Sequence, residues 1–119
     1  MIGRISQRTM FKRLSDEGTY VRSDGLWCRL VVDPKLSISH VGYAIGSHIG
    51  GAVGRNRLRR RLRAIMKTHQ ADLAPGLYLI GVGQVARTYR YSQLESSASR
   101  LISAIKEAIK AQVGHKSVQ

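Results

Sequence analysis

The run Gly54-Arg-Asn-Arg-Leu-Arg-Arg-Arg-Leu-Arg63 contains six arginines in ten residues. The spacing of its leucines predicts that it belongs to a helix of roughly residues 52–69. With residues placed at about 100° intervals, four apolar side chains fall within about 100° of one another, which suits packing on a core. The cations lie on the crest and flanks of the same helix. This helix is therefore expected to expose its arginines and to bury Leu58, Leu62, Ile65 and Met66.

Before this helix, the sequence predicts a short helix, two or three strands and a glycine-rich stretch at residues 46–54. Ser6 is the expected N-cap of the short helix, which carries Met10, Phe11 and Leu14 and ends near Gly18. The expected strands are residues 26–33 and 39–46, with residues 19–22 as a shorter candidate at an edge.

After the arginine helix, a turn at Ala74-Pro75-Gly76 precedes a buried strand at residues 77–82. Ser92 and Glu95 have capping-box spacing for a last helix. Its apolar stripe is Leu94, Ala98, Leu101, Ile102, Ile105 and Ile109. Residues 114–119 are expected to be a frayed tail. The order of elements predicts one small α/β layer domain over residues 1–119.

The charge of the chain indicates a polyanionic partner. Twenty Lys and Arg against seven Asp and Glu give a net charge of +13, and the pI is about 10.9. No acidic residue occurs between Asp33 and Asp72, whereas a solvated helix face usually mixes signs. Nucleic acid is the leading partner and an anionic membrane surface the weaker one. No apolar stretch approaches the ~20 residues that span a bilayer, and no signal-peptide core is visible, so we expect a cytoplasmic protein.

Arginine suits binding to RNA because its planar fork grips phosphate oxygens bidentately and stacks on bases. The unpaired N–H groups at the start of the helix would face the same ligand. The expected RNA-binding residues of the arginine helix are Arg55, Asn56, Arg57, Arg59, Arg60, Arg61, Arg63 and Lys67.

Single-stranded RNA is bound by aromatic side chains set among cations. Three such groups occur in the sequence: Phe11 with Lys12 and Arg13, Trp27 with Arg29, and Arg87 with Tyr89, Arg90 and Tyr91. The alternative for each aromatic residue is packing in the core. Alternation along a strand places Trp27 and Arg29 on one face, so one of them would point the wrong way, and the sequence does not say which.

The chain itself is not expected to be a catalyst. A two-metal nuclease needs several converging carboxylates, and only Asp16 and Glu17 are neighbours in the sequence. The four histidines are scattered without the spacing of metal ligands. For His48, in the glycine-rich loop, phosphate contact or loop hydration is favoured over a role as general base. The run Gly81-Val-Gly-Gln-Val-Ala86 matches a dinucleotide-binding fingerprint, but no apolar helical period follows it, so we reject that interpretation.

Residues 41–63, VGYAIGSHIGGAVGRNRLRRRLR, resemble the signature of the bacterial ribonuclease P protein component, roughly V-G-x-S-V-S-K-K-x-G-x-A-V-x-R-N-R-x-K-R-x-x-R. The resemblance extends more weakly over nearly the whole chain. Gly46-Ser47-His48 stands where the family usually has Ser-Lys-Lys, and Ser15 where many members have a second aromatic residue. The matching positions are Val41, Gly42, Gly50, Ala52, Val53, Arg55, Asn56, Arg57, Arg60 and Arg63, with Arg59 replacing lysine.

The resemblance implies a two-layer α-β sandwich of order αβββαβα with a left-handed βαβ crossover. It also implies a ribonucleoprotein that removes the 5′ leader of precursor tRNA, in which the RNA subunit hydrolyses the phosphodiester with bound Mg²⁺. The protein would dock on the catalytic RNA through its arginine helix and hold the leader in a cleft between the sheet and the first helix. The expected cleft residues are Phe11, Lys12, Trp27, Arg29, His48, Arg87 and Tyr89. No metal ligand in the protein, no membrane and no obligatory protein partner are expected.

Two other classes of function remain as alternatives. A ribosomal or RNA-scaffolding protein also needs a basic face on a small α/β domain. An autonomous endonuclease would cleave precursor tRNA without any RNA subunit.

Overall fold

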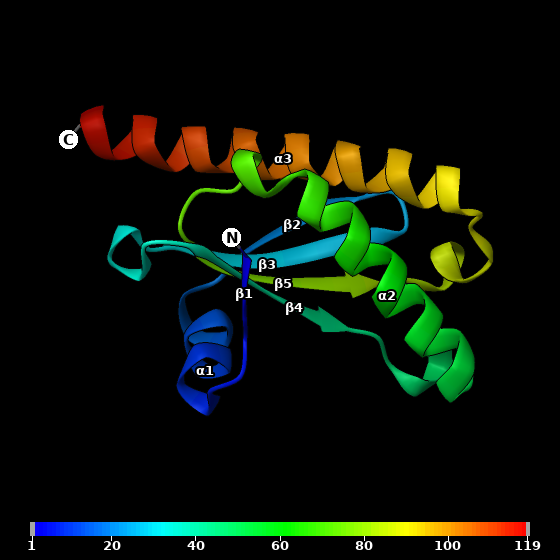
Figure 1. The fold of residues 1–119 in the computed structure, drawn as a ribbon. Coiled ribbons are helices and arrows are strands. Elements are labelled where there is room, and N and C mark those ends of the chain that lie inside the picture. Colours follow the sequence, from blue (N-terminus) through cyan, green and yellow to red (C-terminus); the bar gives the residue numbers. More distant parts are fainter. Residues whose placement is uncertain (1, 119) are drawn as a thin grey trace.

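The computed structural model describes residues 2–118, with side chains for residues 2–111. Five strands form one mixed sheet, in the order β1-β4-β5-β3-β2. Two helices, α2 and α3, cover one face of this sheet, and α1 lies against the other (Figure 1). The elements are β1 (Ile2–Arg4), α1 (Arg8–Glu17), β2 (Thr19–Ser23), β3 (Leu26–Val32), β4 (Ser39–Ala44), α2 (Ala52–Thr68), β5 (Gly76–Val82) and α3 (Tyr91–Val118), with short 3-10 turns η1 (Pro34–Leu36), η2 (Ser47–Ile49), η3 (Gln70–Asp72) and η4 (Gln84–Thr88).

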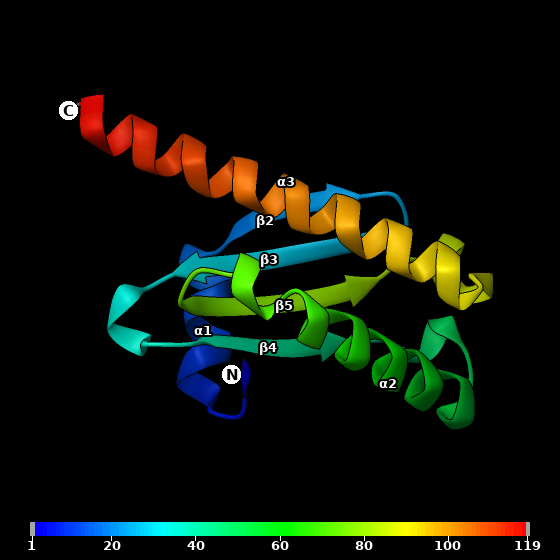
Figure 2. The same cartoon turned by 45° about the horizontal axis from the view of Figure 1, so that its top comes forward.

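The connection from β4 through α2 to β5 is a left-handed crossover. β4 and β5 are parallel neighbours in the sheet. In Figure 2 both strands run to the right, β5 lies above β4, and α2 passes in front of the sheet. A chain that advances upward by this route turns left-handed, against the strong right-handed preference of such units. The crossover that the family resemblance implied is therefore present.

Alternation along the strands builds the main core between the sheet and α2 and α3. Leu26, Cys28 and Leu30 of β3 face this layer, as do Tyr78, Ile80 and Val82 of β5. From α2, the predicted stripe of Leu58, Leu62, Ile65 and Met66 is buried against them. From α3, Leu94, Ala98, Leu101, Ile102 and Ile105 are buried, and Ile109 packs beside them half-buried.

A smaller core holds α1 against the opposite face. Leu14 of α1 is buried with Val31 of β3 and Leu77 of β5, and Met10 packs at its margin. An ion pair also links α1 to the end of β3, because Arg13 Nη1 donates to Asp33 Oδ2 over 2.9 Å. Trp27 precedes Val31 by four residues, about 13 Å along a strand. The helix therefore covers one end of this face and leaves the other end open.

β2 and β3 form a tight hairpin. Ser23 pairs with Leu26, so Asp24 and Gly25 make a two-residue turn. Asp24 has a φ of +53°, the left-handed conformation that such turns require. The turn fixes the register and places Tyr20 opposite Arg29.

The predicted elements are confirmed, and the shorter candidate strand is β2 at one edge of the sheet. The sequence analysis missed β1, which adds an edge strand parallel to β4. Ser6 is not the N-cap of α1, because the cap position is Gln7 and its side chain makes no capping bond. The capping box of Ser92 and Glu95 is also wrong: α3 begins at Tyr91, and Gln93 Oε1 accepts from Arg90 N–H over 2.8 Å. Residues 114–118, expected as a frayed tail, belong to α3; Gln119 lies outside the described residues.

Candidate nucleic-acid interface

The outward side of α2 carries the predicted arginine surface. Leucines on its inner side fix the rotation of the helix, so the cations that alternate with them must face away from the core or along its flanks. Asn56, Arg57, Arg60, Arg63 and Lys67 are exposed, while Arg55, Arg59 and Arg61 are half-buried on the flanks. All eight predicted residues thus lie on one continuous helix of 17 residues.

The cations of α2 are left without acidic partners. Five of the seven carboxylates engage cations elsewhere, in the ion pairs Lys12–Asp16, Arg13–Glu17, Arg13–Asp33, Arg100–Asp24, Lys106–Asp72 and His69–Asp72. Within the described side chains, none of the seven cations between residues 55 and 67 is paired with a carboxylate. The positive potential of α2 is therefore not neutralised by the protein.

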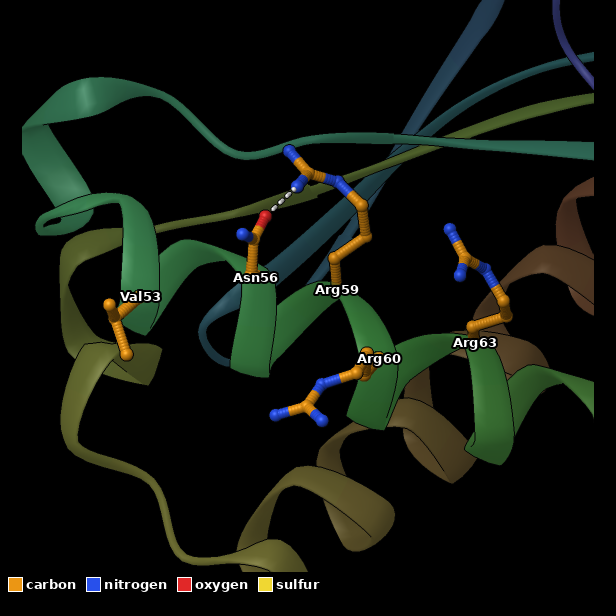
Figure 3. Close-up of a pocket in the computed structure, with 5 residues that line it drawn as sticks. All are labelled: Val53, Asn56, Arg59, Arg60 and Arg63. Atoms are coloured by element: carbon orange, nitrogen blue, oxygen red, sulfur yellow. Dashed lines mark hydrogen bonds between the residues drawn. The ribbon is translucent and has the colours of Figure 1, made fainter.

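A shallow hollow on α2 shows how these side chains are arranged (Figure 3). It is lined by Val53, Asn56, Arg59, Arg60 and Arg63. Arg59 Nη1 donates to Asn56 Oδ1 over 2.9 Å, which orients both side chains. Arg60 points to the other side of the helix from Arg59 and Arg63 in this view. Guanidinium groups on both sides of one helix can contact two neighbouring phosphate strands.

The first turn of α2 adds backbone donors to this surface. The N-cap, Gly51, has no side chain to cap the helix. Its first N–H groups are therefore available to an anion, in line with the positive end of the helix dipole. In the same turn, Arg55 Nε is buried without a hydrogen-bond partner among the described residues.

Tyr91 extends the arginine surface to the start of α3. It is exposed and shares a hollow with Arg57, Arg60, Arg61 and Ala64. The sequence analysis grouped Tyr91 with Tyr89, but the two lie in different surroundings. Tyr89 is half-buried against the main core, so its core-packing alternative describes it better than a cleft position.

At its C-terminal half, α2 borders a groove beside the sheet edge. Tyr43 of β4, Arg63 and Lys67 line this groove together with residues 2–4 of β1. Burial raises the pKa of Tyr43 to about 12, and the nearby charge of Arg63 acts in the opposite direction. The phenol is thus neutral at physiological pH and can serve as a hydrogen-bonding group.

On the open face of the sheet, Trp27 and Arg29 point to the same side, away from α2 and α3. The expectation that one of them would point the wrong way is wrong, because neither enters the main core. The indole of Trp27 lies across Gly81 of β5, where only the absence of a side chain leaves room for it. The stem of Arg29 packs over Gly18, at the end of α1.

The other predicted cleft residues lie on α1, η2 and η4. Phe11 is 46% exposed and lies outside the buried cluster that holds α1. Lys12 is exposed and pairs with Asp16 over 3.1 Å. His48 shares a hollow with Trp27, and its carbonyl accepts from Gln84 Nε2 over 3.3 Å. Arg87 is exposed in η4.

The described residues include no cluster of three or more His, Cys, Asp and Glu side chains that could hold a metal ion. Five of the seven carboxylates engage cations in the ion pairs above. The donor set therefore does not fit a metal centre. Cys28 is buried, and burial raises the pKa of its thiol to about 12, so it is a poor nucleophile. Across the described chain, no helix is both long and apolar enough to cross a membrane.

Comparisons with known proteins agree with this arrangement. The family model described as Ribonuclease P matches residues 3–106. A ribonuclease P protein component from Synechococcus sp. is 33% identical over 106 residues, covering 83% of this chain and 78% of that protein. The one from Beutenbergia cavernae is 45% identical over 40 residues, 34% of either chain. A solved structure of a Staphylococcus aureus RNase P protein mutant superposes with a TM-score of 0.81 at 20% identity, covering 87% of both chains.

Proposed function

This chain belongs to the ribonuclease P protein family, and from that premise we propose that it is the protein subunit of a ribonuclease P holoenzyme. In this role it binds the catalytic RNA and the 5′ leader of precursor tRNA, and it promotes endonucleolytic removal of the leader. The RNA subunit carries out the hydrolysis. A cytoplasmic location follows from this role, because precursor tRNA is processed where it is transcribed.

The unneutralised cations of α2 are the observation that carries the proposal. Among the described side chains, all seven are free of acidic partners, and the helix that carries them is docked rigidly by buried leucines. A protein that neutralises several phosphates releases the counterions condensed on the RNA, which drives binding. Hydrogen bonds such as that between Arg59 and Asn56 reduce the entropy lost when the side chains meet phosphates.

The open face of the sheet supports leader binding. It offers Trp27 and His48 beside one surface hollow, with Arg29 packed at the end of α1 and Phe11 exposed on α1 itself. Aromatic and cationic groups on a sheet surface suit an unpaired strand, whose bases are free to stack. Catalytic RNA and leader would thus contact different faces of one small domain.

Mg²⁺ would supply the metal-assisted hydrolysis and would be held mainly by the RNA. The described residues gather no group of three or more potential metal ligands, so no residue of the protein is assigned as a ligand. The contribution of the protein is to bind and orient RNA.

Reconstitution tests the proposal directly. The protein is added to a candidate catalytic RNA at low Mg²⁺, and 5′ maturation of precursor tRNA is measured. We expect the protein to enhance maturation. No enhancement, together with co-purification with ribosomes, would favour a ribosomal or RNA-scaffolding protein instead. Cleavage by rigorously RNA-free protein would show an autonomous endonuclease.

A further inference from the structure

The groove between α2 and the β1 edge of the sheet gathers basic side chains from elements that lie far apart in the sequence. Arg4 of β1 lines it together with Arg63 and Lys67 of α2. Ile2 and Arg4 are two positions apart on one strand, so they share a face of the sheet. Because Ile2 packs on the core beneath α2 and α3, Arg4 lies on the side of the sheet that α2 covers, away from α1.

The three cations of this groove have no acidic partner. Within the described side chains, none of the ion pairs involves Arg4, Arg63 or Lys67, and no carboxylate lines the groove. Asp72 follows the groove residue Gln70 by two positions, but its carboxylate already accepts from Lys106 over 3.3 Å. The groove therefore presents three positive charges that the protein does not neutralise.

A phenol group lies among these cations. Tyr43 of β4 lines the groove, and its ring packs against the main core. In the described part of the chain its hydroxyl makes no hydrogen bond, whereas the hydroxyl of Tyr78 donates to the carbonyl of Ala74 over 2.7 Å. Since burial raises the pKa of Tyr43 to about 12, the phenol keeps its proton at physiological pH. It is thus a free donor in a cationic groove.

Three cations and one neutral donor favour an anionic ligand that accepts hydrogen bonds from several directions. Phosphate has this chemistry, because arginine grips its oxygens with a planar fork and lysine binds it as a point charge. The groove measures about 400 Å³, within the range of about 300–1,000 Å³ that is usual for ligand sites. This volume leaves room beside a phosphate for the sugars that carry it.

The groove continues the arginine surface of α2. Arg63 lines both the groove and the hollow drawn in Figure 3, where Arg59 and Arg63 point away from the side that Arg60 takes. Arg59, Arg63 and Lys67 are spaced four residues apart, so successive side chains lie about 6 Å apart along the helix. An RNA strand bound along this row would reach the groove at its Lys67 end. Continuity with the row favours a backbone phosphate of RNA over a free phosphate ion.

We propose that this groove binds one backbone phosphate of the catalytic RNA, which accepts from the Tyr43 hydroxyl and lies among the three cations. The inference rests on the proposed function, because the RNA expected along α2 is the catalytic subunit. It adds two residues outside α2, Arg4 and Tyr43, which the pattern of the sequence did not single out. Contacts from both the helix and the sheet edge would fix the orientation of the RNA about α2, which contacts from one helix alone do not.

Tyr43→Phe tests the hydroxyl without changing the charge or the packing of the ring. Binding of the catalytic RNA alone is measured by filter binding over a range of salt concentrations. We expect the affinity to fall about 10- to 150-fold, the range for one hydrogen bond to a charged group. The salt slope should stay unchanged, because no cation is removed. Tyr20→Phe is the matched control, since it removes an exposed hydroxyl from the opposite face and should bind as wild type. Equal affinities of the wild type and Tyr43→Phe would refute the site.

Arg4→Gln tests whether the sheet edge takes part. Removal of one phosphate-binding cation should lower the slope of log affinity against log salt by about one. Lys110→Gln removes an exposed cation from α3 and should keep the wild-type slope. A wild-type slope for Arg4→Gln would overturn the proposal that the phosphate lies between β1 and α2.

Titration of the protein alone keeps this site apart from the proposed function. Inorganic phosphate is added at constant ionic strength, with chloride as the reference anion, and NMR follows the tyrosine ring signals. The Tyr43 signals are assigned by their loss in Tyr43→Phe. We expect phosphate to shift them saturably and to leave those of Tyr20 in place, and no shift would refute the site.

The maturation assay completes the separation. If phosphate shifts the Tyr43 signals but the protein fails to enhance maturation, the phosphate site stands and the proposed function fails. If the protein enhances maturation and Tyr43→Phe binds the catalytic RNA as wild type, the function stands and the groove is refuted as an RNA contact, even where free phosphate binds.

Discussion

The indole of Trp27 lies directly across Gly81 on the neighbouring strand, so that a Cβ atom at Gly81 would collide with the ring. This contact explains the first glycine of the run Gly81-Val-Gly-Gln-Val-Ala86, which resembles a dinucleotide fingerprint. Gly81 accommodates an aromatic side chain, and η4 rather than a long helix follows it. The relation between these two residues sets the position of the ring on the open face.

Gly81→Ala is therefore expected to displace Trp27. The new methyl group would force the indole off the strand and break its stack with Tyr20. Overpacking of this kind costs about 1–3 kcal/mol of the free energy of unfolding. Near-ultraviolet circular dichroism and Trp emission should both change, and urea denaturation gives the stability. Unchanged spectra would mean that the ring does not depend on the glycine.

Local periodicity was sufficient to predict α2 and α3. The stripe of α2 and that of α3 are defined by residues three and four positions apart, and burial of Leu62 and Leu101 follows from that spacing alone. The arginine surface was predictable for the same reason, because the leucines fix the rotation of the helix.

Features that depend on distant partners were not predictable in this way. The three residues of β1 have no periodic pattern, and they form a strand because Ile2 pairs with Ser39, far along the chain. The position of Tyr20 opposite Arg29 did have a local signal that was overlooked. Asp24-Gly25 is a strong two-residue hairpin turn, and once it is recognised the register follows. The start of α3 at Tyr91 shows that a capping pattern alone does not fix a helix boundary.

Asp33→Asn tests the link between α1 and β3. The hydrogen bond from Arg13 is the main cause that lowers the pKa of Asp33, and the N–H of Lys35 adds to it. A carboxyl group with a lowered pKa stabilises the fold above its unfolded pKa, and this stabilisation is lost as pH falls through the folded value. The variant should therefore be less stable than wild type at neutral pH. This difference in the free energy of unfolding should shrink as pH falls below about 3.9, the ordinary pKa of Asp.

Urea denaturation at several pH values measures this difference. Asp16→Asn is the matched control, because the Lys12–Asp16 pair is far more exposed and such pairs contribute little. A stability difference for Asp33→Asn that is constant with pH would argue against an electrostatic role for the carboxylate.

Arg60→Ala and Arg63→Ala should weaken assembly with the catalytic RNA without unfolding the domain. Both side chains are exposed on α2. Each substitution should reduce the slope of log affinity against log salt by about one, since each removes about one phosphate contact. Filter binding over a range of salt concentrations measures the slopes. Lys110→Ala, which removes an exposed cation from α3, is the control and should leave the slope unchanged. Wild-type slopes for both arginine variants would show that α2 is not the docking surface.

Phe11→Ala should affect the leader more than the body of the tRNA. The ring is 46% exposed and outside the buried cluster of α1, so its removal should cost little stability. Loss of one stacked base should lower the affinity of the holoenzyme for precursor tRNA by about 1–3 kcal/mol. Mature tRNA, which has no leader, serves as the control ligand in the same binding assay. Equal losses for precursor and mature tRNA would indicate that Phe11 acts only through packing.

Leu62→Ala separates folding from RNA binding on the same helix. Leu62 is fully buried against the sheet, one residue before the exposed Arg63. Its truncation removes apolar contacts and leaves a cavity, which typically costs about 2–5 kcal/mol of the free energy of unfolding. Urea denaturation should show this loss, while the folded fraction at low temperature should bind the catalytic RNA with the wild-type salt slope. A changed slope in that folded fraction would mean that the leucine stripe also sets the orientation of the arginines, rather than only anchoring the helix.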